Sequence, residues 1–151
     1  LDPTRDRDAF ALRCSARDRE RMLGVGYGFG IFVDGAFAGE INLSSIHRGP
    51  FQNGYVGYWI DEARAGHGYM SEANVILFKY AFEDLRLHRL QVSIIPRNRN
   101  SHRVVEKLDL RNEGTAVRYL EINGEWEDHV RYAITAEEWV ERRSAYTRDW
   151  L

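Results

Sequence analysis

The chain has 151 residues, 44% of them hydrophobic and 29% charged, which is the size and composition of one globular domain. Its formal net charge is −2, so no overall basic character indicates a nucleic-acid-binding protein. The single cysteine excludes an internal disulfide. No apolar run approaches about 18 residues, which excludes a membrane-spanning helix in this sequence. The histidines lack zinc-ligand spacing, which excludes a clustered zinc site. We therefore expect one cytoplasmic domain over residues 1–151 that binds no metal, nucleic acid or membrane.

The first part of the chain predicts a helix followed by three antiparallel strands. The helical segment is highly charged with sparse apolar positions, which is typical of a weakly amphipathic helix. Asp34-Gly35 predicts a tight hairpin, because both residues tolerate positive φ. A polar turn then leads to a strand rich in aromatic and β-branched residues. In chain order, the predicted elements are a helix at 8–23 and strands at 29–33, 36–46 and 55–60.

The second part alternates helices and strands. A second hairpin is predicted at Asn123-Gly124, and a capping box is predicted from Thr135 to Glu138 at the start of the last helix. The predicted elements are helices at 69–85, 101–108 and from 136 onwards, and strands at 90–95, 111–122 and 125–134. This order predicts an α+β domain with a mixed sheet, in which the 69–85 helix is a crossover between two strands.

A turn with two glycines, Gly66 and Gly68, stands between the predicted strand at 55–60 and the helix at 69–85. The first N–H groups of a helix are unpaired and its dipole favours negative charge, so this arrangement is typical of an anion site. The alternative is that the glycines only make a tight turn. The spacing matches neither a P-loop nor a complete dinucleotide fingerprint.

An ordered series of motifs resembles a known family. Residues 64–73 resemble the acyl-CoA pyrophosphate loop of the GNAT superfamily of N-acetyltransferases, and more narrowly its RimJ/RimL branch, which acetylates protein N-terminal amines. Residues 56–60 resemble the G-Y-W strand before that loop, and residues 80–90 the Y-A-F-x-x-L-x-L-H-R join after it. Residues 98–108 resemble N-x-x-S-x-R-V-x-E-K-L, and residues 126–129 belong to a closing hairpin like that of the branch.

The resemblance covers residues 28–138 and implies a GNAT-like fold, with a mostly antiparallel sheet flanked by helices in an α/β three-layer sandwich. It also implies transfer of an acetyl group from acetyl-CoA to an amine by direct attack, with a protein or peptide N-terminal α-amine as acceptor. The residues that the resemblance assigns to acetyl-CoA binding are Tyr58, Trp59, Ile60, Arg64, Ala65, Gly66, His67, Gly68, Tyr69, Met70, Asn98 and Ser101.

Two residues are candidates for catalysis. Ser101 matches the family serine near the thiol and would donate a proton to the leaving thiolate; the alternative is that Asn98 and Ser101 only cap the following helix. The attacking amine must be neutral, so a general base is expected. Glu40 is the first candidate base, and a solvated strand carboxylate is its alternative. Residues that would instead line the acceptor groove, or an exposed hairpin face, are Tyr119, Asp128 and His129.

The sequence departs from the family pattern at three places. Ala63 stands where the loop usually opens with Gln or Arg, and Tyr55 stands where relatives often carry Glu. Asp109-Leu110 replaces the usual Gly-Phe, and we expect a small stability cost because Asp tolerates a left-handed conformation less well than Gly.

Three alternatives to protein N-terminal acetylation stay open: acetylation of a small amine or antibiotic, use of a longer acyl-CoA, and a non-catalytic CoA-binding module. The family also usually has a first strand and helix before the region where this sequence starts. An uncovered sheet edge invites pairing, so we expect a further segment or a partner chain, such as a second copy in a homodimer, to cover it.

Overall fold

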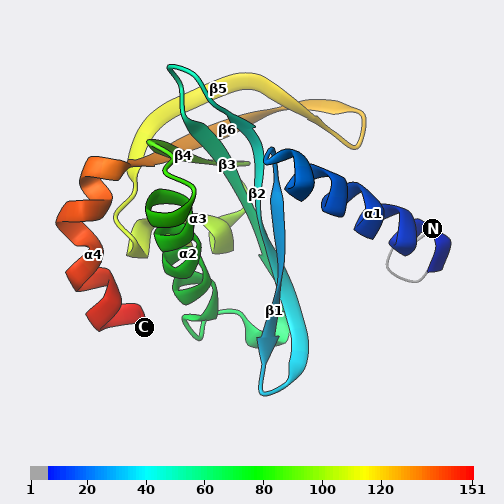
Figure 1. The fold of residues 1–151 in the computed structure, drawn as a ribbon, viewed down its shortest axis with the longest axis horizontal. Coiled ribbons are helices and arrows are strands. Elements are labelled where there is room, and N and C mark those ends of the chain that lie inside the picture. The colour runs from blue at the N-terminus through cyan, green and yellow to red at the C-terminus, as the bar shows by residue number, and fades with distance from the viewer. Residues whose placement is uncertain (1–6) are drawn as a thin grey trace.

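Six strands form one sheet in the order β1-β2-β3-β4-β6-β5, with helices on both faces (Figure 1). Every neighbouring pair is antiparallel except β3 and β4, which are parallel and joined through α2. The computed structural model describes residues 7–151 and confirms the α+β, mostly antiparallel fold. Its elements are α1 (Arg7–Leu23), β1 (Tyr27–Val33), β2 (Ala36–His47), β3 (Asn53–Ile60), the 3₁₀ turn η1 (Glu62–Arg64), α2 (Tyr69–Lys79), the π-helical turn η2 (Tyr80–Asp84), β4 (Arg89–Ile94), α3 (Arg99–Lys107), β5 (Arg111–Ile122), β6 (Glu125–Thr135) and α4 (Ala136–Trp150).

Both predicted hairpin turns are confirmed. Asp34 and Gly35 have φ of 52° and 80°, and Asn123 and Gly124 have φ of 51° and 84°. Two successive residues with positive φ match the twist of the flanking strands, which explains why Asp-Gly and Asn-Gly occupy these positions.

The helices differ from the prediction in detail. The predicted helix at 69–85 changes character after Lys79, where the Leu85 N–H donates to the Tyr80 carbonyl at 3.0 Å and widens the last turn. The 3₁₀ turn η1 was not predicted from the sequence. The predicted capping box of α4 is confirmed, because Thr135 Oγ1 accepts from the Glu138 N–H and Glu138 Oε1 accepts from the Thr135 N–H.

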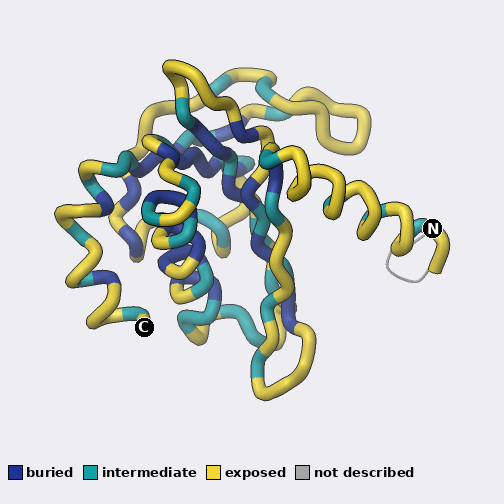
Figure 2. Tube along the Cα trace, viewed as in Figure 1, coloured by how far each residue is buried: buried dark blue, intermediate teal, exposed yellow. Residues whose placement is uncertain are grey.

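The sheet has a covered face and an open face, and residues alternate between them along each strand. On β4, Leu90, Val92 and Ile94 face the core beneath α2 and α4 and are all buried. Figure 2 shows these buried stretches in the middle of the sheet and on the inner side of α2. The open face instead carries polar side chains, and there Gln91 Nε2 donates to Asn53 Oδ1 at 3.1 Å.

The parallel strands β3 and β4 separate soon after they meet. Their pairing covers only Asn53 to Tyr55 on β3 and Arg89 to Gln91 on β4. Beyond Tyr55, β3 stays paired with β2 alone. The separation leaves one backbone edge of the second half of β3 unpaired and positions the site described below.

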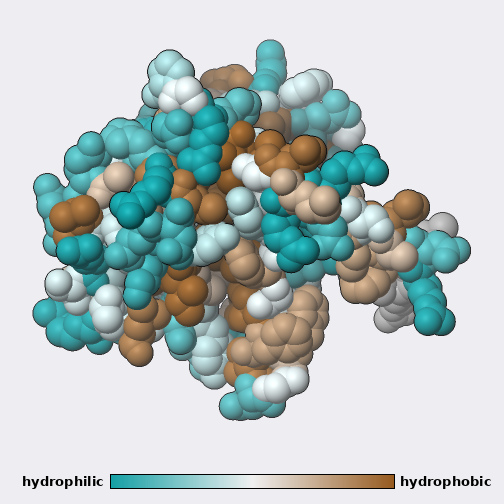
Figure 3. Space-filling model, in the orientation of Figure 1, coloured by the Kyte–Doolittle hydropathy of each residue, from teal (hydrophilic) through white to brown (hydrophobic). Residues whose placement is uncertain are grey.

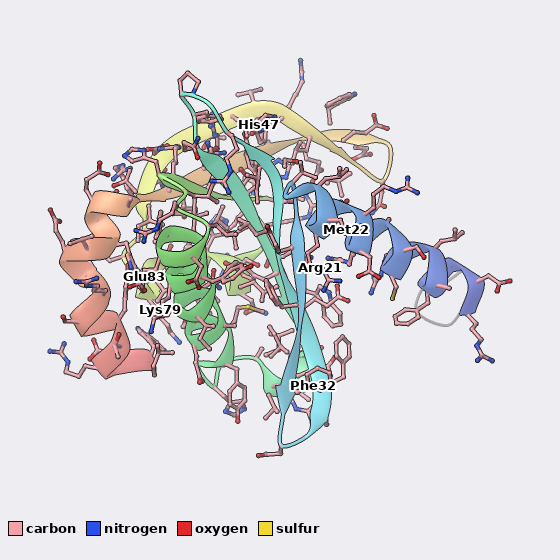
Figure 4. The ribbon with its side chains drawn as sticks, in the orientation of Figure 1. Arg21, Met22, Phe32, His47, Lys79 and Glu83 are labelled. Atoms are coloured by element: carbon pink, nitrogen blue, oxygen red, sulfur yellow. The ribbon has the colours of Figure 1, made fainter. Side chains whose placement is uncertain are left out.

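The outer part of the sheet is more exposed. β1 is an edge strand, and α1, which contains no buried residue, is held to β2 through Arg13 and Arg17. Figure 3 shows hydrophobic residues over the β1–β2 hairpin, where Figure 4 places Phe32, which is 63% exposed. In residues 7–151, no helix is long and apolar enough to cross a membrane.

Asp109 adopts a left-handed conformation with φ of 55°, just after the C-terminal end of α3. This is the conformation that the family's glycine would adopt without strain, so the geometry behind the predicted stability cost is present.

Candidate active site

A cavity of about 400 Å³ lies between the end of β3, the glycine turn, the start of α2 and α3. Most of its lining residues were predicted from the sequence, and the turn and the two helices bring those residues together around one space. The predicted residues that line it are Tyr58, Trp59, Ile60, Arg64, Ala65, Gly66, Gly68, Tyr69, Met70, Asn98 and Ser101. His67 does not line it: its side chain is turned to the surface, with its ring 5.9 Å from the ring of Tyr69.

The glycine turn sets the entry into α2. Gly66 and Gly68 have φ of 80° and 83°, and Gly68 is the N-cap residue of α2. The first intrahelical bond runs from the Glu72 N–H to the Gly68 carbonyl, so the N–H groups of Tyr69, Met70 and Ser71 precede it. These free donors and the positive end of the helix dipole give the turn the properties of an anion site.

Charged side chains reinforce that character. Arg64 from the turn and Arg103 and Lys107 from α3 line the cavity, against one carboxylate, Glu62. Arg103 and Lys107 are four residues apart and therefore share one side of α3. These two residues were not predicted as site residues from the sequence, although their helical spacing next to Asn98 and Ser101 was a signal that could have identified them.

Tyr58 connects β3 to α3. Its hydroxyl donates to the Ser101 carbonyl at 2.9 Å, and burial raises the pKa of Tyr58 well above its usual value, so the phenol stays protonated. This hydrogen bond fixes the start of α3 beside the half of β3 that β4 leaves unpaired. The backbone of Tyr58 to Ile60 is therefore available on that side to an extended ligand.

A second, narrower cavity of about 210 Å³ adjoins the first. Tyr58, Asn98 and Ser101 line both cavities. The narrow cavity occupies the space where β3 and β4 separate, and residues from both faces of the sheet line it. Its remaining lining residues are Val56, Gly57, Val92, Ser93, Ile94, Ile95 and His129. The two cavities, which share these three lining residues, are together called the slot.

Asn98 and Ser101 combine a structural and a site position. Asn98 Oδ1 accepts from the Ser101 N–H at 3.3 Å and so caps α3, as the alternative reading of the sequence supposed. Both residues nevertheless line both cavities, so the cap holds them at the point where the cavities meet.

Comparison with known proteins supports the assignment that the motifs suggested. A family model described as an acetyltransferase (GNAT) domain matches residues 2–111. The chain belongs to the GNAT acetyltransferases. It is 44% identical over 110 residues to the probable N-acetyltransferase YjcK of Bacillus subtilis, a match that covers 72% of this chain and 61% of YjcK.

Further relatives support the RimJ/RimL-like type. The chain is 34% identical over 122 residues to the ribosomal protein uS5-alanine N-acetyltransferase of Escherichia coli, covering 80% of this chain and 63% of that enzyme. The structure of Mycobacterium smegmatis RimJ in complex with CoA-disulfide matches with a TM-score of 0.86 and 32% identity, over 95% of this chain and 71% of that one. The GNAT chain thus spans less than two thirds of the length of the two curated relatives.

Glu40, the base predicted from the sequence of this GNAT chain, lies outside both cavities. Glu40 is on the open face of β2, its Oε1 accepts from Arg13 at 2.6 Å, and its Oε2 lies 3.5 Å from Arg17. Trp59 Nε1 also donates to Oε2, at 3.4 Å. Glu40 lines neither cavity of the slot, and these contacts favour a role in attaching α1 to the sheet.

The three hairpin candidates of the GNAT chain have different surroundings. Asp128 is exposed, and its Oδ1 accepts from the Arg118 N–H at 2.8 Å. Tyr119 is half-buried and packs edge-on against His129, with 5.8 Å between the ring centroids. His129 is buried and lines the narrow cavity, so of these three it is the one that the structure brings to Ser101.

Proposed function

We propose that this chain transfers an acetyl group from acetyl-CoA to an amine, with a protein or peptide N-terminal α-amine as the acceptor. The observation that carries the proposal is the slot: a wide, cation-lined cavity and a narrow cavity that meet at Tyr58, Asn98 and Ser101. Such a slot offers one compartment for a large phosphorylated cofactor and one for a small nucleophile, with the reacting atoms at the junction.

The wide cavity suits acetyl-CoA. The turn amides from Ala65 to Met70 would hold the pyrophosphate, and Arg103 and Lys107 would add positive charge for its phosphates. The unpaired edge of Tyr58 to Ile60 would hydrogen-bond the pantetheine arm, and Asn98 would contact the same arm. The thioester would then lie beside Ser101, whose hydroxyl would protonate the leaving thiolate.

Two observations support a protein N-terminus as the acceptor: the name of a relative and the position of the narrow cavity between two strands. The Escherichia coli relative is named for acetylating an alanine of ribosomal protein uS5, which points to a protein N-terminus here as well. A cavity of about 210 Å³ between two strands admits a chain end more readily than a folded surface. The sequence also predicted Glu40 as a base, and comparing Glu40→Gln with a variant of His129 tests which of the two residues has that role.

Calorimetric titration with acetyl-CoA, followed by thiol release with N-terminal peptides and small amines, tests the proposal. We expect acetyl-CoA binding and thiol release that depends on a peptide with a free α-amine. Release with polyamines or antibiotics alone would identify a small-molecule enzyme, and faster release from a longer acyl-CoA would change the donor. Binding without release would identify a CoA-binding module, and no binding would refute both proposals.

Cellular location and assembly also belong to this proposal. A ribosomal-protein acceptor and a single exposed cysteine, Cys14, fit a cytoplasmic protein. A homodimer that covers the β1 edge stays a prediction, and light scattering on the purified chain tests it.

A further inference from the structure

His129 is buried, at 4% exposure, and only one of its ring nitrogens is occupied. Its Nδ1 lies 2.9 Å from the Glu127 carbonyl oxygen, and among residues 7–151 its Nε2 has no hydrogen-bond partner. His102, nearby on α3, differs: its Nδ1 contacts the Tyr132 hydroxyl and its Nε2 contacts the Ile95 carbonyl.

The contact with Glu127 fixes the tautomer of His129. A carbonyl oxygen can only accept a hydrogen bond, so Nδ1 must carry the proton. In the neutral ring Nε2 then carries a free lone pair, which makes it a proton acceptor. The backbone of β6 thus orients this imidazole as a base without using a second side chain.

His129 is one of the residues that line the narrow cavity of the slot. His129 lines this cavity together with Ser93 and Ser101, and among the described residues around it His129 is the only side chain with a basic nitrogen. No carboxylate belongs to this described lining. Within residues 7–151, Ser93 Oγ is also buried without a hydrogen-bond partner, so the cavity holds a further polar group that an amine N–H could satisfy.

The groups around His129 do not replace it as a base. On β5, Tyr119 packs edge-on against its ring. On β3, the pKa of Tyr55 is raised by burial and then by Tyr119. The Arg131 guanidinium lies 5.5 Å from the centre of the Tyr119 ring.

The nearby carboxylates of β6 are already engaged. The Glu127 carboxylate accepts from Arg97 at 2.5 Å, and the Asp128 carboxylate accepts from the Arg118 N–H. No carboxylate of β4 or α3 lines the narrow cavity. The titratable group that β3 contributes to its lining is the phenol of Tyr58, which stays protonated.

We propose that His129 is the general base of the transfer reaction, accepting a proton at Nε2 from the incoming ammonium group. This inference rests on the proposed function and names the residue that makes its acceptor nucleophilic. It also assigns different roles to two predicted residues, because Glu40 is held by Arg13 and Arg17 outside the slot while His129 lies inside it.

The three protons of the ammonium group have three different destinations. Nε2 takes one proton from R–NH₃⁺, and the neutral amine then attacks the thioester carbonyl carbon with its lone pair. As the C–N bond forms and the C–S bond breaks, the sulfur leaves with the bonding pair. The nitrogen loses its second proton through the Ser101 hydroxyl to the thiolate, which gives the free thiol. The amide keeps the third proton, and the imidazolium returns its proton to solvent.

His129→Asn tests the role, because an Asn amide can still donate to the Glu127 carbonyl but offers no basic nitrogen at the Nε2 position. The proposed base has to take one proton from the ammonium group, and about one-tenth of an amine with a pKa of about 8 is already neutral at pH 7, so we expect a loss of about tenfold in kcat/KM at pH 7. An α-amine has a pKa of about 8, so at about pH 9.5 the substrate is already neutral. We therefore expect the variant to approach the parent rate at that pH, with unchanged calorimetric affinity for CoA.

His47→Gln is the matched control. His47 is exposed at the end of β2 opposite the β1–β2 hairpin (Figure 4) and lines neither cavity, so we expect the parent pH profile. Should His129→Asn fail to fold, His129→Gln gives a second variant without a base. A loss equal at all pH values, or no loss, would overturn the role of His129 while leaving the transferase intact. Absence of thiol release by the parent chain would instead refute the proposed function and this inference together.

Discussion

The two faces of β4 differ in what they do. Leu90, Val92 and Ile94 on the covered face are apolar and at most 4% exposed, and they pack into one hydrophobic core with α2 and α4. Gln91 and Ser93 on the open face are a hydrogen-bonding link in the sheet and an unpaired hydroxyl at the slot. One strand thus contributes alternately to stability and to the site, and the two contributions should be separable by mutation.

The largest expected effect is on the covered face. Phe78 of α2 is fully buried, and its ring lies 6.3 Å from that of Tyr146. Phe78→Ala should lower the free energy of unfolding by about 3–5 kcal/mol, because it removes buried apolar surface and leaves a cavity. Urea denaturation measures this loss. Ile76→Ala on the same helix is the control, since Ile76 is 53% exposed and should cost about 0.5 kcal/mol or less. Equal losses would refute the division of α2 into a buried side that contributes to stability and an exposed side that does not.

A smaller effect is expected from the open face. Gln91 is 1% exposed, donates to Asn53 Oδ1 and accepts from Arg131 Nη2 at 2.8 Å. Gln91→Met keeps the volume but leaves both partners unsatisfied, so we expect a loss of about 1–3 kcal/mol in unfolding free energy. The same denaturation experiment measures it. A neutral result would mean that water replaces the lost partners.

Between the two faces, the glycine turn should affect binding more than stability. Gly68→Ala places a Cβ on a residue with φ of 83° and 3.4 Å from the Trp150 ring, which costs about 1–2 kcal/mol. We expect this strain to reorient the turn amides and to weaken CoA binding by about tenfold, measured by calorimetry. Gly49→Ala is the matched control, because its φ is 66° with nothing within 4 Å and it lies away from the slot. Weaker CoA binding in both variants would count against a specific role for the turn.

The smallest effect concerns an ion pair on the open face. Hydrogen bonds from Arg89 hold the pKa of Glu113 below its usual value of 4.5. A lowered folded-state pKa gives stability that is present above pH 4.5 and is lost as the pH falls through the folded-state pKa. Glu113→Gln should therefore cost about 1 kcal/mol or less at pH 7, and the difference from the parent should shrink towards pH ~3. Thermal unfolding across pH 3–7 measures this, and a gap that widens in acid would contradict the assignment.

Local patterns in the sequence predicted the elements and the glycine turn before α2. The Asp-Gly and Asn-Gly hairpins, the Thr135 capping box and the Gly66–Gly68 turn each depend on a few neighbouring residues, so their chemistry is visible in the sequence. The left-handed conformation of Asp109 was visible for the same reason.

Contacts between distant segments were harder to predict. The pairing of Glu40 with Arg13 and Arg17 depends on how α1 lies against β2, and strand periodicity says only which face Glu40 occupies. The separation of β3 from β4 depends on a register that no single strand encodes. His129 was only one of three hairpin candidates, because its burial and its bond to a backbone carbonyl arise from the packing of Tyr119 and the diverging strands.

The separation of β3 and β4 also has a kinetic consequence. Under the proposed function, a cofactor in the wide cavity and an amine in the narrow cavity would each have a compartment of its own and would meet at Ser101, so neither would block the other. Among the described residues, no cysteine lines either cavity to carry the acetyl group between two half-reactions, since Cys14 is exposed on α1. Under the proposed function, a transferase built on this slot would work through a ternary complex, in which both substrates are bound before the first product leaves, rather than through an acylated enzyme.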